Sequence, residues 1–298
     1  MQGVEIGLGE VPMNRRYCFL LSLLIPLSAN AEKGRAAWQG PDKSVYVVTQ
    51  NHYAEGFSPE GNTPKFDDLI AVQIFNRDAL PAGSAPYKVG EHLALFVGAQ
   101  RQGDVTIKKV MPFQCNSSAA VVTAEPSVHL AKDAMALATN AENVRPHGNN
   151  QRKPNDAEFA HAKRLAMNEF LKHGVPAEFS KSLKIDRAIV MRVDETAGEW
   201  LVGSLFVEVE GARHEIFLIA MMANSGATTE LARYHKTTDI EDGKDAQDVR
   251  FVDQLDLDGD GTDEIVVEVT GYESEAFVIY KRISGLWRRV HFGGQGGC

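Results

Sequence analysis

The sequence contains few cysteines and few long apolar runs. There are three cysteines in 298 residues, and aromatic residues make up 8% of the chain. So few cysteines exclude a small scaffold built from disulfides, which needs a far higher density of bridges. Beyond the N-terminal region the longest apolar stretch is 216–223, which is much shorter than the roughly 20 residues needed to cross a bilayer. We therefore expect a globular chain that does not span a membrane once its leader is removed.

The sequence also lacks a complete catalytic motif. His214 and Glu215 begin like a zinc-protease helix, but the second histidine is missing and the segment has a strand pattern. Ser225 lies beside Gly226, but alanines occupy positions 223 and 227, where a nucleophile elbow needs glycines. A non-catalytic protein is therefore expected, with an exported hydrolase built from scattered residues as the alternative. A pocket that brought two or more of four histidines near carboxylates would favour the hydrolase: His129, His214, His235 and His291.

The chain has no excess of positive charge. Its formal net charge is -9, so nothing in the composition attracts it to nucleic acid or to an anionic membrane surface. The expected partner is an unknown macromolecule or a glycan.

The N-terminal segment has the pattern of an export signal. Arg15 and Arg16 precede an apolar run over 18–27, and Ala29 and Ala31 form an A-x-A cleavage site. We predict a signal peptide over 1–31, with cleavage after Ala31 and translation starting at Met1 or Met13. An uncleaved anchor is disfavoured because the apolar run is too short to span a bilayer. The mature chain is expected in the periplasm or outside the cell.

Removal of this signal leaves two cysteines, Cys115 and Cys298. An exported protein meets an oxidising environment, so a single bridge between them is the leading prediction. Glycines before Cys298 give the tail the freedom to reach a distant partner. Two free thiols, or a bridge to another molecule, are the alternatives.

Strand patterns dominate, so the predicted fold class is mainly β (α+β). An N-terminal β-rich domain over 32–139 is expected to form a small antiparallel sheet or barrel, and the alanine-rich segment 127–139 is expected to be helical. The polar segment 140–154 has the composition of a linker. Apolar patterns and turn residues place the strands of the first domain at 45–49, 69–75, 92–97, 105–110 and 119–123.

The predicted second domain, 155–298, begins with an amphipathic helix. Asn155 and Glu158 form a capping box, and Gly174 with Pro176 ends the helical pattern. Antiparallel strands follow, two of them joined as a hairpin across Glu210 and the next residue. These strands are predicted at 188–193, 200–209, 214–221, 249–255, 265–270, 276–282 and 286–292.

One acidic loop stands between two of these strands. Carboxylates occupy its first, third, fifth and ninth positions, with a glycine at the sixth. Calcium takes six to eight oxygen ligands, and alternate residues of a tight loop can turn their oxygens to one centre. Magnesium fits less well because it demands strict octahedral geometry. The sequence therefore predicts a Ca²⁺ site formed by the side chains of Asp256, Asp258, Asp260 and Glu264 and the carbonyl of Thr262.

This loop resembles the calcium loops of FG-GAP and VCBS-type repeats, the blade units of integrin-α-like β-propellers. Their signature is D-x-D-G-D-G-x-x-D followed by an apolar strand, and here Glu264 replaces the last Asp. An EF-hand is excluded because Val267 stands where a bidentate Glu is required. The resemblance covers only about 249–292, and no second intact copy occurs in the chain. It implies one blade-like calcium unit that stabilises an exported fold, rather than a complete propeller.

Overall fold

The structure is a computed structural model. Its first six strands form a closed barrel. It describes residues 38, 40–50, 69–75, 88–112, 120–131, 134–146, 151–195, 198–223, 226–238, 240, 245–272 and 274–297. The predicted signal peptide and both cysteines of the predicted bridge, Cys115 and Cys298, lie outside these residues. Those two predictions therefore stay predictions.

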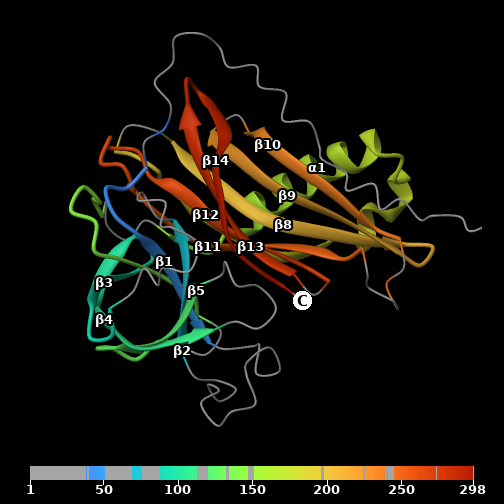
Figure 1. Ribbon diagram of the computed structural model, residues 1–298. Coiled ribbons are helices and arrows are strands. Elements are labelled where there is room, and N and C mark those ends of the chain that lie inside the picture. Colours follow the sequence, from blue (N-terminus) through green and yellow to red (C-terminus); the bar gives the residue numbers. More distant parts are fainter. Residues whose placement is uncertain are drawn as a thin grey trace, which may run out of the picture. The chain divides into compact units, whose positions relative to one another are not determined.

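Six antiparallel strands close the barrel in the order β1-β2-β5-β4-β3-β6 (Figure 1). The short strand β6 pairs with both β1 and β3, which joins the two ends of the sheet. The strands are β1 Val45–Gln50, β2 Leu69–Phe75, β3 His92–Val97, β4 Gln100–Pro112, β5 Ala120–Pro126 and β6 Ala136–Thr139.

Strand β1 is apolar on both faces because both are covered. Tyr46 and Val48 point into the barrel core, while Val45 and Val47 belong to a second core that includes residues of the C-terminal sheet. Successive side chains of a strand point to opposite faces. The inner face of β1 therefore packs in the barrel core, and its outer face packs in the second core.

The predicted helix over 127–139 is wrong. All four residues of β6, Ala136–Thr139, are buried and extended. Alanine favours helix by only a few tenths of a kcal/mol per residue over ordinary residues, roughly. The backbone hydrogen bonds that this segment makes with β1 and β3 outweigh that preference.

The helix α1, Asp156–Lys172, begins at the predicted cap. The Asn155 side chain accepts the Glu158 N–H at 3.0 Å, and the Glu158 carboxylate accepts the Asn155 N–H at 2.8 Å. A 3₁₀ turn, Ala177–Ser182, follows the helix. The capping box is thus confirmed, and it fixes where the helix begins.

Two four-stranded antiparallel sheets follow, each in a meander order, and with the barrel they confirm a mainly β fold with one α-helix among the described residues. Strand β10 was not predicted from the sequence, and it is the longest strand without a prediction. The first sheet has β7 Lys184–Met191, β8 Glu199–Val209, β9 Ala212–Ala223 and β10 Gly226–Thr237; the second has β11 Gln247–Leu255, β12 Glu264–Gly271, β13 Ser274–Ile283 and β14 Leu286–Gly297.

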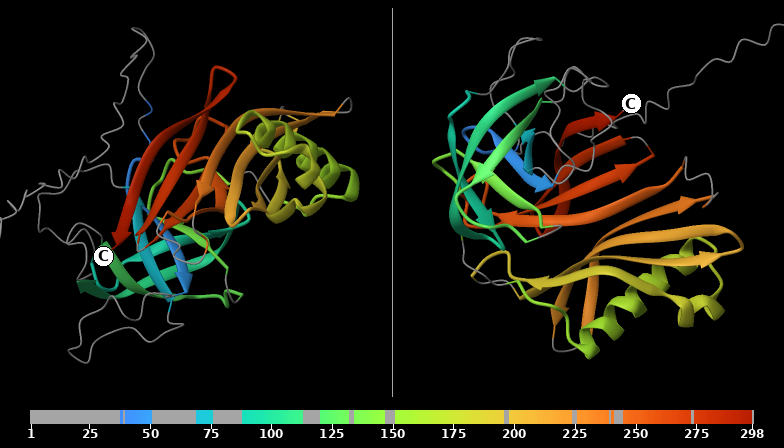
Figure 2. Two further views of the ribbon diagram at one scale, coloured as in Figure 1. Left: turned by 90° about the vertical axis from the view of Figure 1, so that its right-hand side faces the viewer. Right: turned by 90° about the horizontal axis from the view of Figure 1, so that it is seen from below.

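The first sheet is covered on both faces. Helix α1 lies across one face, with Leu165 and Phe170 buried against it (Figure 2). The other face packs on the second sheet, where the rings of Trp200 and Trp287 meet edge to face at 5.5 Å. The second sheet uses its opposite face for the core that it shares with β1 and β2.

The described parts of the predicted linker pair with the C-terminal sheets. Arg145 forms a bridge with Asp256, and Arg152 forms one with Val190. Arg145 thus pairs beside the second sheet and Arg152 pairs with the first. Among the described residues, the structure contains no helix that is both long and apolar enough to cross a membrane.

Candidate metal centre

The acidic loop connects β11 to β12, as predicted. Leu255 and Glu264 form the last register pair of this hairpin, so residues 256–263 make the turn. Gly259 and Gly261 have φ of +76° and +92°, values that favour glycine. At Gly259 a side chain would also meet the Asn143 carbonyl oxygen, 2.6 Å from an added Cβ. The two glycines therefore allow the tight turn that gathers the carboxylates.

Asp256 organises the backbone of the loop. It is fully buried, and its Oδ1 accepts the N–H groups of Gly259 and Asp260 at 2.7 and 3.0 Å. Its Oδ2 accepts the Gly261 N–H at 2.9 Å. Three backbone N–H groups of the loop thus converge on the Asp256 carboxylate, which holds the turn in place.

Three of the predicted ligands converge. One carboxylate oxygen from each of Asp256, Asp258 and Asp260 lies within 4.8 Å of the others. Thr262 adjoins them and donates its N–H to Asp260 at 3.0 Å. Asp263, a buried neighbour that was not predicted as a ligand, instead accepts a hydrogen bond from Gln254 at 2.7 Å.

A lysine that the sequence analysis missed also enters this cluster. The Lys281 ammonium lies 2.9 Å from both carboxylate oxygens of Asp258, 2.9 Å from Asp260 and 2.6 Å from Glu264. Register pairing of Ile265 with Tyr280 places Lys281 opposite Glu264. A cationic group therefore already contacts three of the predicted metal ligands.

Lys281 remains charged in this position. Burial lowers the pKa of the Lys281 ammonium. The charges and hydrogen bonds of Glu264, Asp258 and Asp260 raise the same pKa by a larger amount, so its net shift is upward. Asp258, Asp260 and Glu264 contact this one ammonium, and Asp256 lies beside Asp258 and Asp260. Burial raises the pKa of Glu264 to about 8 although Lys281 opposes the shift, so this carboxyl adds little negative charge at neutral pH. The three aspartates still outnumber the one ammonium, so the cluster retains attraction for a further cation.

Asp253 is a further buried carboxyl group, three residues before the loop. Its Oδ1 accepts hydrogen bonds from Gln151 Nε2 at 2.6 Å and from the Ala99 N–H at 3.1 Å. Its Oδ2 is buried and has no hydrogen-bond partner among the described residues. Burial raises the pKa of Asp253 to about 7, although these hydrogen bonds oppose the shift.

The protein is expected to lose stability as the pH rises from about 5 to about 8. The Asp253 pKa is about 7 in the folded chain and about 3.9 in an unfolded one, so between these values only the folded state keeps the proton. This contribution is complete below about pH 4 and disappears as the pH passes 7, with an amplitude of roughly 2–4 kcal/mol. Urea unfolding at several pH values measures the effect.

Asp253→Asn is the matched variant for this pH dependence. An asparagine keeps an oxygen acceptor for Gln151 and Ala99 but cannot ionise, so its pH profile should be flatter. Glu215, whose pKa burial also raises to about 7, contributes in the same direction and stays in both proteins. Identical pH profiles for the two proteins would contradict the assignment.

The four histidines do not gather at a carboxylate-lined pocket in the described structure. His214 Nδ1 bonds the Tyr234 hydroxyl at 2.7 Å, His291 Nε2 bonds the Ile74 carbonyl at 2.9 Å, and His129 is exposed. Of the four, only His235 lines the cavity that contains Glu215. This arrangement does not meet the condition set for the hydrolase alternative.

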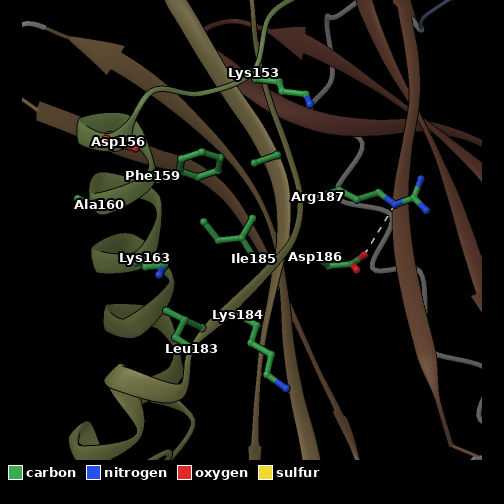
Figure 3. A pocket seen from close by; sticks show the side chains of 11 residues that line it. Lys153, Asp156, Phe159, Ala160, Lys163, Leu183, Lys184, Ile185, Asp186 and Arg187 are labelled. Carbon is green, nitrogen blue, oxygen red and sulfur yellow. Dashed lines mark ion pairs between the residues drawn. The ribbon is translucent and has the colours of Figure 1, made fainter.

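A larger, open groove of about 990 Å³ lies between α1 and the edge strand β7 (Figure 3). Phe159 and Ile185 face each other across it, whereas Asp186 and Arg187 point away from the helix and form a 3.9 Å ion pair. The β7–β8 register also shifts between Ile185 and Arg187. Charged side chains and a bulge protect an edge strand from pairing with other chains. These features account for the charged side chains on the edge strand, and the groove supports no ligand assignment.

The fold and the loop define a class of structure: an antiparallel β protein whose hairpin loop gathers carboxylates around a cationic group. Compared with protein-family models, curated proteins and solved structures, the chain matches none of them. The resemblance to FG-GAP and VCBS-type repeats therefore stays a prediction that rests on the residues of the loop.

Proposed function

We propose that this is an exported, non-catalytic calcium-binding protein, and that calcium stabilises a fold whose role is structural or the binding of a macromolecule or glycan. The observation that carries the proposal is the convergence of Asp256, Asp258 and Asp260 within 4.8 Å. Three hard oxygen ligands at this separation suit a calcium ion, with Glu264 and water completing its coordination.

Lys281 has to move for the ion to reach full coordination. Its ammonium lies at 2.6–2.9 Å from Asp258, Asp260 and Glu264, and two cations cannot share these oxygens without strong repulsion. We therefore propose that calcium displaces the ammonium of Lys281. The long, flexible lysine side chain allows this without a change in the backbone.

The position of the loop explains how an ion would stabilise the whole fold. Leu257 is fully buried in the core shared by the barrel and the second sheet, and the Asp256 carbonyl accepts the Arg145 N–H at 3.0 Å. An ion bound by Asp256 and its neighbours would hold this junction in place. Binding to the folded state alone adds its free energy to stability.

Thermal melting in calcium, magnesium and chelator tests the proposal. Calcium at a hundredfold excess over its Kd adds about 2.7 kcal/mol, which should raise the Tm by roughly 5–10 °C. Magnesium should give a smaller shift, and Asp258→Ala should abolish the response.

Asp104→Ala is the matched control for the melting experiment. Asp104 is an exposed carboxylate in an ion pair with Arg101 on the barrel, far in sequence from the loop, so its loss should leave the calcium response intact. An unchanged Tm of the natural protein at millimolar calcium would refute the calcium site.

A further inference from the structure

A cavity of about 210 Å³ lies between the two four-stranded sheets, beside the edge strands β10 and β14. Both sheets contribute side chains to it. On the first sheet, Arg233 pairs with Phe217 and His235 pairs with Glu215. Directly opposed residues project on the same face of a sheet, so these four side chains all face the second sheet.

The second sheet supplies the opposite wall. Across β14 and β13, Arg289 pairs with Tyr280 and Phe292 pairs with Val278. Tyr280 and Val278 belong to the core between the two sheets, so all four side chains face the first sheet. Tyr280 and Val278 are buried, and the Tyr280 ring stacks on Phe217 with centroids 6.0 Å apart. The floor of the cavity is therefore apolar and aromatic, while the arginines stand at its mouth.

In the described structure, aromatic rings rather than anionic groups contact the two arginines. Neither Arg233 nor Arg289 makes an ion pair or a side-chain hydrogen bond with the residues that the structure describes. Each is held by an aromatic ring instead: the Arg233 Cζ lies 5.5 Å from the Tyr280 centroid, and the Arg289 Cζ lies 5.8 Å from that of Phe292. Such contacts leave the N–H groups of a guanidinium available to an anion.

Glu215 does not satisfy these arginines. Its carboxylate is almost fully buried and accepts a hydrogen bond from Arg213 Nε at 3.1 Å. Glu215 is the one carboxyl group among the lining residues, and its charged neighbours are Arg213 and Asp248. Among the described residues, none that lines the cavity forms an ion pair with Arg233 or Arg289, and the two guanidinium groups stand beside its apolar floor.

We infer that this cavity binds a small organic carboxylate with a short apolar or aromatic body. Guanidinium groups match a carboxylate with paired, charge-assisted hydrogen bonds, and the apolar floor accepts the body of the ligand. At about 30 Å³ per water, the cavity has room for roughly seven waters, which limits the ligand to about the size of one ring. This binding site goes beyond the proposed calcium function and does not depend on it.

Ligand-observed NMR on the full chain tests the inference, with benzoate and hexanoate as probes at up to about 10 mM, a tenfold excess over a millimolar Kd. Both should bind saturably, in calcium and in chelator alike. Benzamide, which has the same ring without the charge, should bind at least about tenfold more weakly. Inorganic phosphate should also bind more weakly because it has no apolar body.

The double variant R233Q/R289Q should weaken benzoate binding by about tenfold or more. R288Q is the matched control, because Arg288 is an exposed neighbour on the same strand that does not line the cavity. Circular dichroism checks that both variants fold. The inference is overturned if neither carboxylate saturates, if phosphate binds as tightly as benzoate, or if the double variant retains full affinity.

Discussion

Replacing Lys281 with methionine should destabilise the calcium-free protein by about 3–5 kcal/mol at pH 9, above the Glu264 pKa of about 8, because removal of one partner leaves a buried charge uncompensated. Glu264 is fully buried and Lys281 is its ion-pair partner at 2.6 Å. Asp258 and Asp260 lose the same ammonium, so the loop carboxylates would repel one another. Urea unfolding in chelator measures the loss.

Calcium should reverse much of this loss. Without the competing ammonium, Lys281→Met should bind calcium more tightly than the natural protein, so its Tm should rise more on calcium addition. Lys172→Met is the control, since Lys172 forms an exposed ion pair with Glu169 on α1, and such pairs contribute little. A Lys281→Met protein as stable in chelator as this control would show that the ammonium is not the counter-charge of the loop.

Phe277→Ala is expected to cost about 3–5 kcal/mol, the usual range for removing a buried aromatic ring. Phe277 is fully buried on β13, in the core that joins the second sheet to Val45, Val47 and Ile70 of the barrel. Because this core belongs to both parts, the barrel and the sheets should unfold together in the variant and in the natural protein.

Urea unfolding followed by circular dichroism and by tryptophan fluorescence measures both aspects of this prediction. The two probes should report the same midpoint, shifted to lower urea in Phe277→Ala. Phe292→Ala removes the same ring from an exposed position on β14 and should shift the midpoint far less. Separate transitions, only one of them moved by Phe277→Ala, would contradict a shared core.

The segments that were predicted well owe their structure to local chemistry. Asn155 and Glu158 set the start of α1 through a contact between residues three apart, so the sequence contains both partners. The turn at Glu210 and Gly211 likewise needs only left-handed backbone, at φ of 50° and 80°. Most strands of both sheets also carry apolar patterns that identify them without their neighbours.

The segments that were missed depend on distant partners. Residues 136–139 are alanine-rich, but they pair with β1 and β3 to close the barrel. Strand β10 was assigned no structure, because its Thr-, Glu- and Arg-containing sequence has little apolar alternation; it forms by pairing along β9. In both cases pairing with another strand outweighs weak local preference.

Local sequence patterns were enough to predict the mainly β character, the helix with its cap, and the acidic loop in which Asp256, Asp258 and Asp260 converge. These follow from side-chain period and from residues a few positions apart. The contact of Lys281 with the loop and the shared cavity of Arg233 and Arg289 became visible only in the folded chain. Those neighbours meet through strand register and sheet packing, which depend on burial across the whole fold rather than on any local pattern.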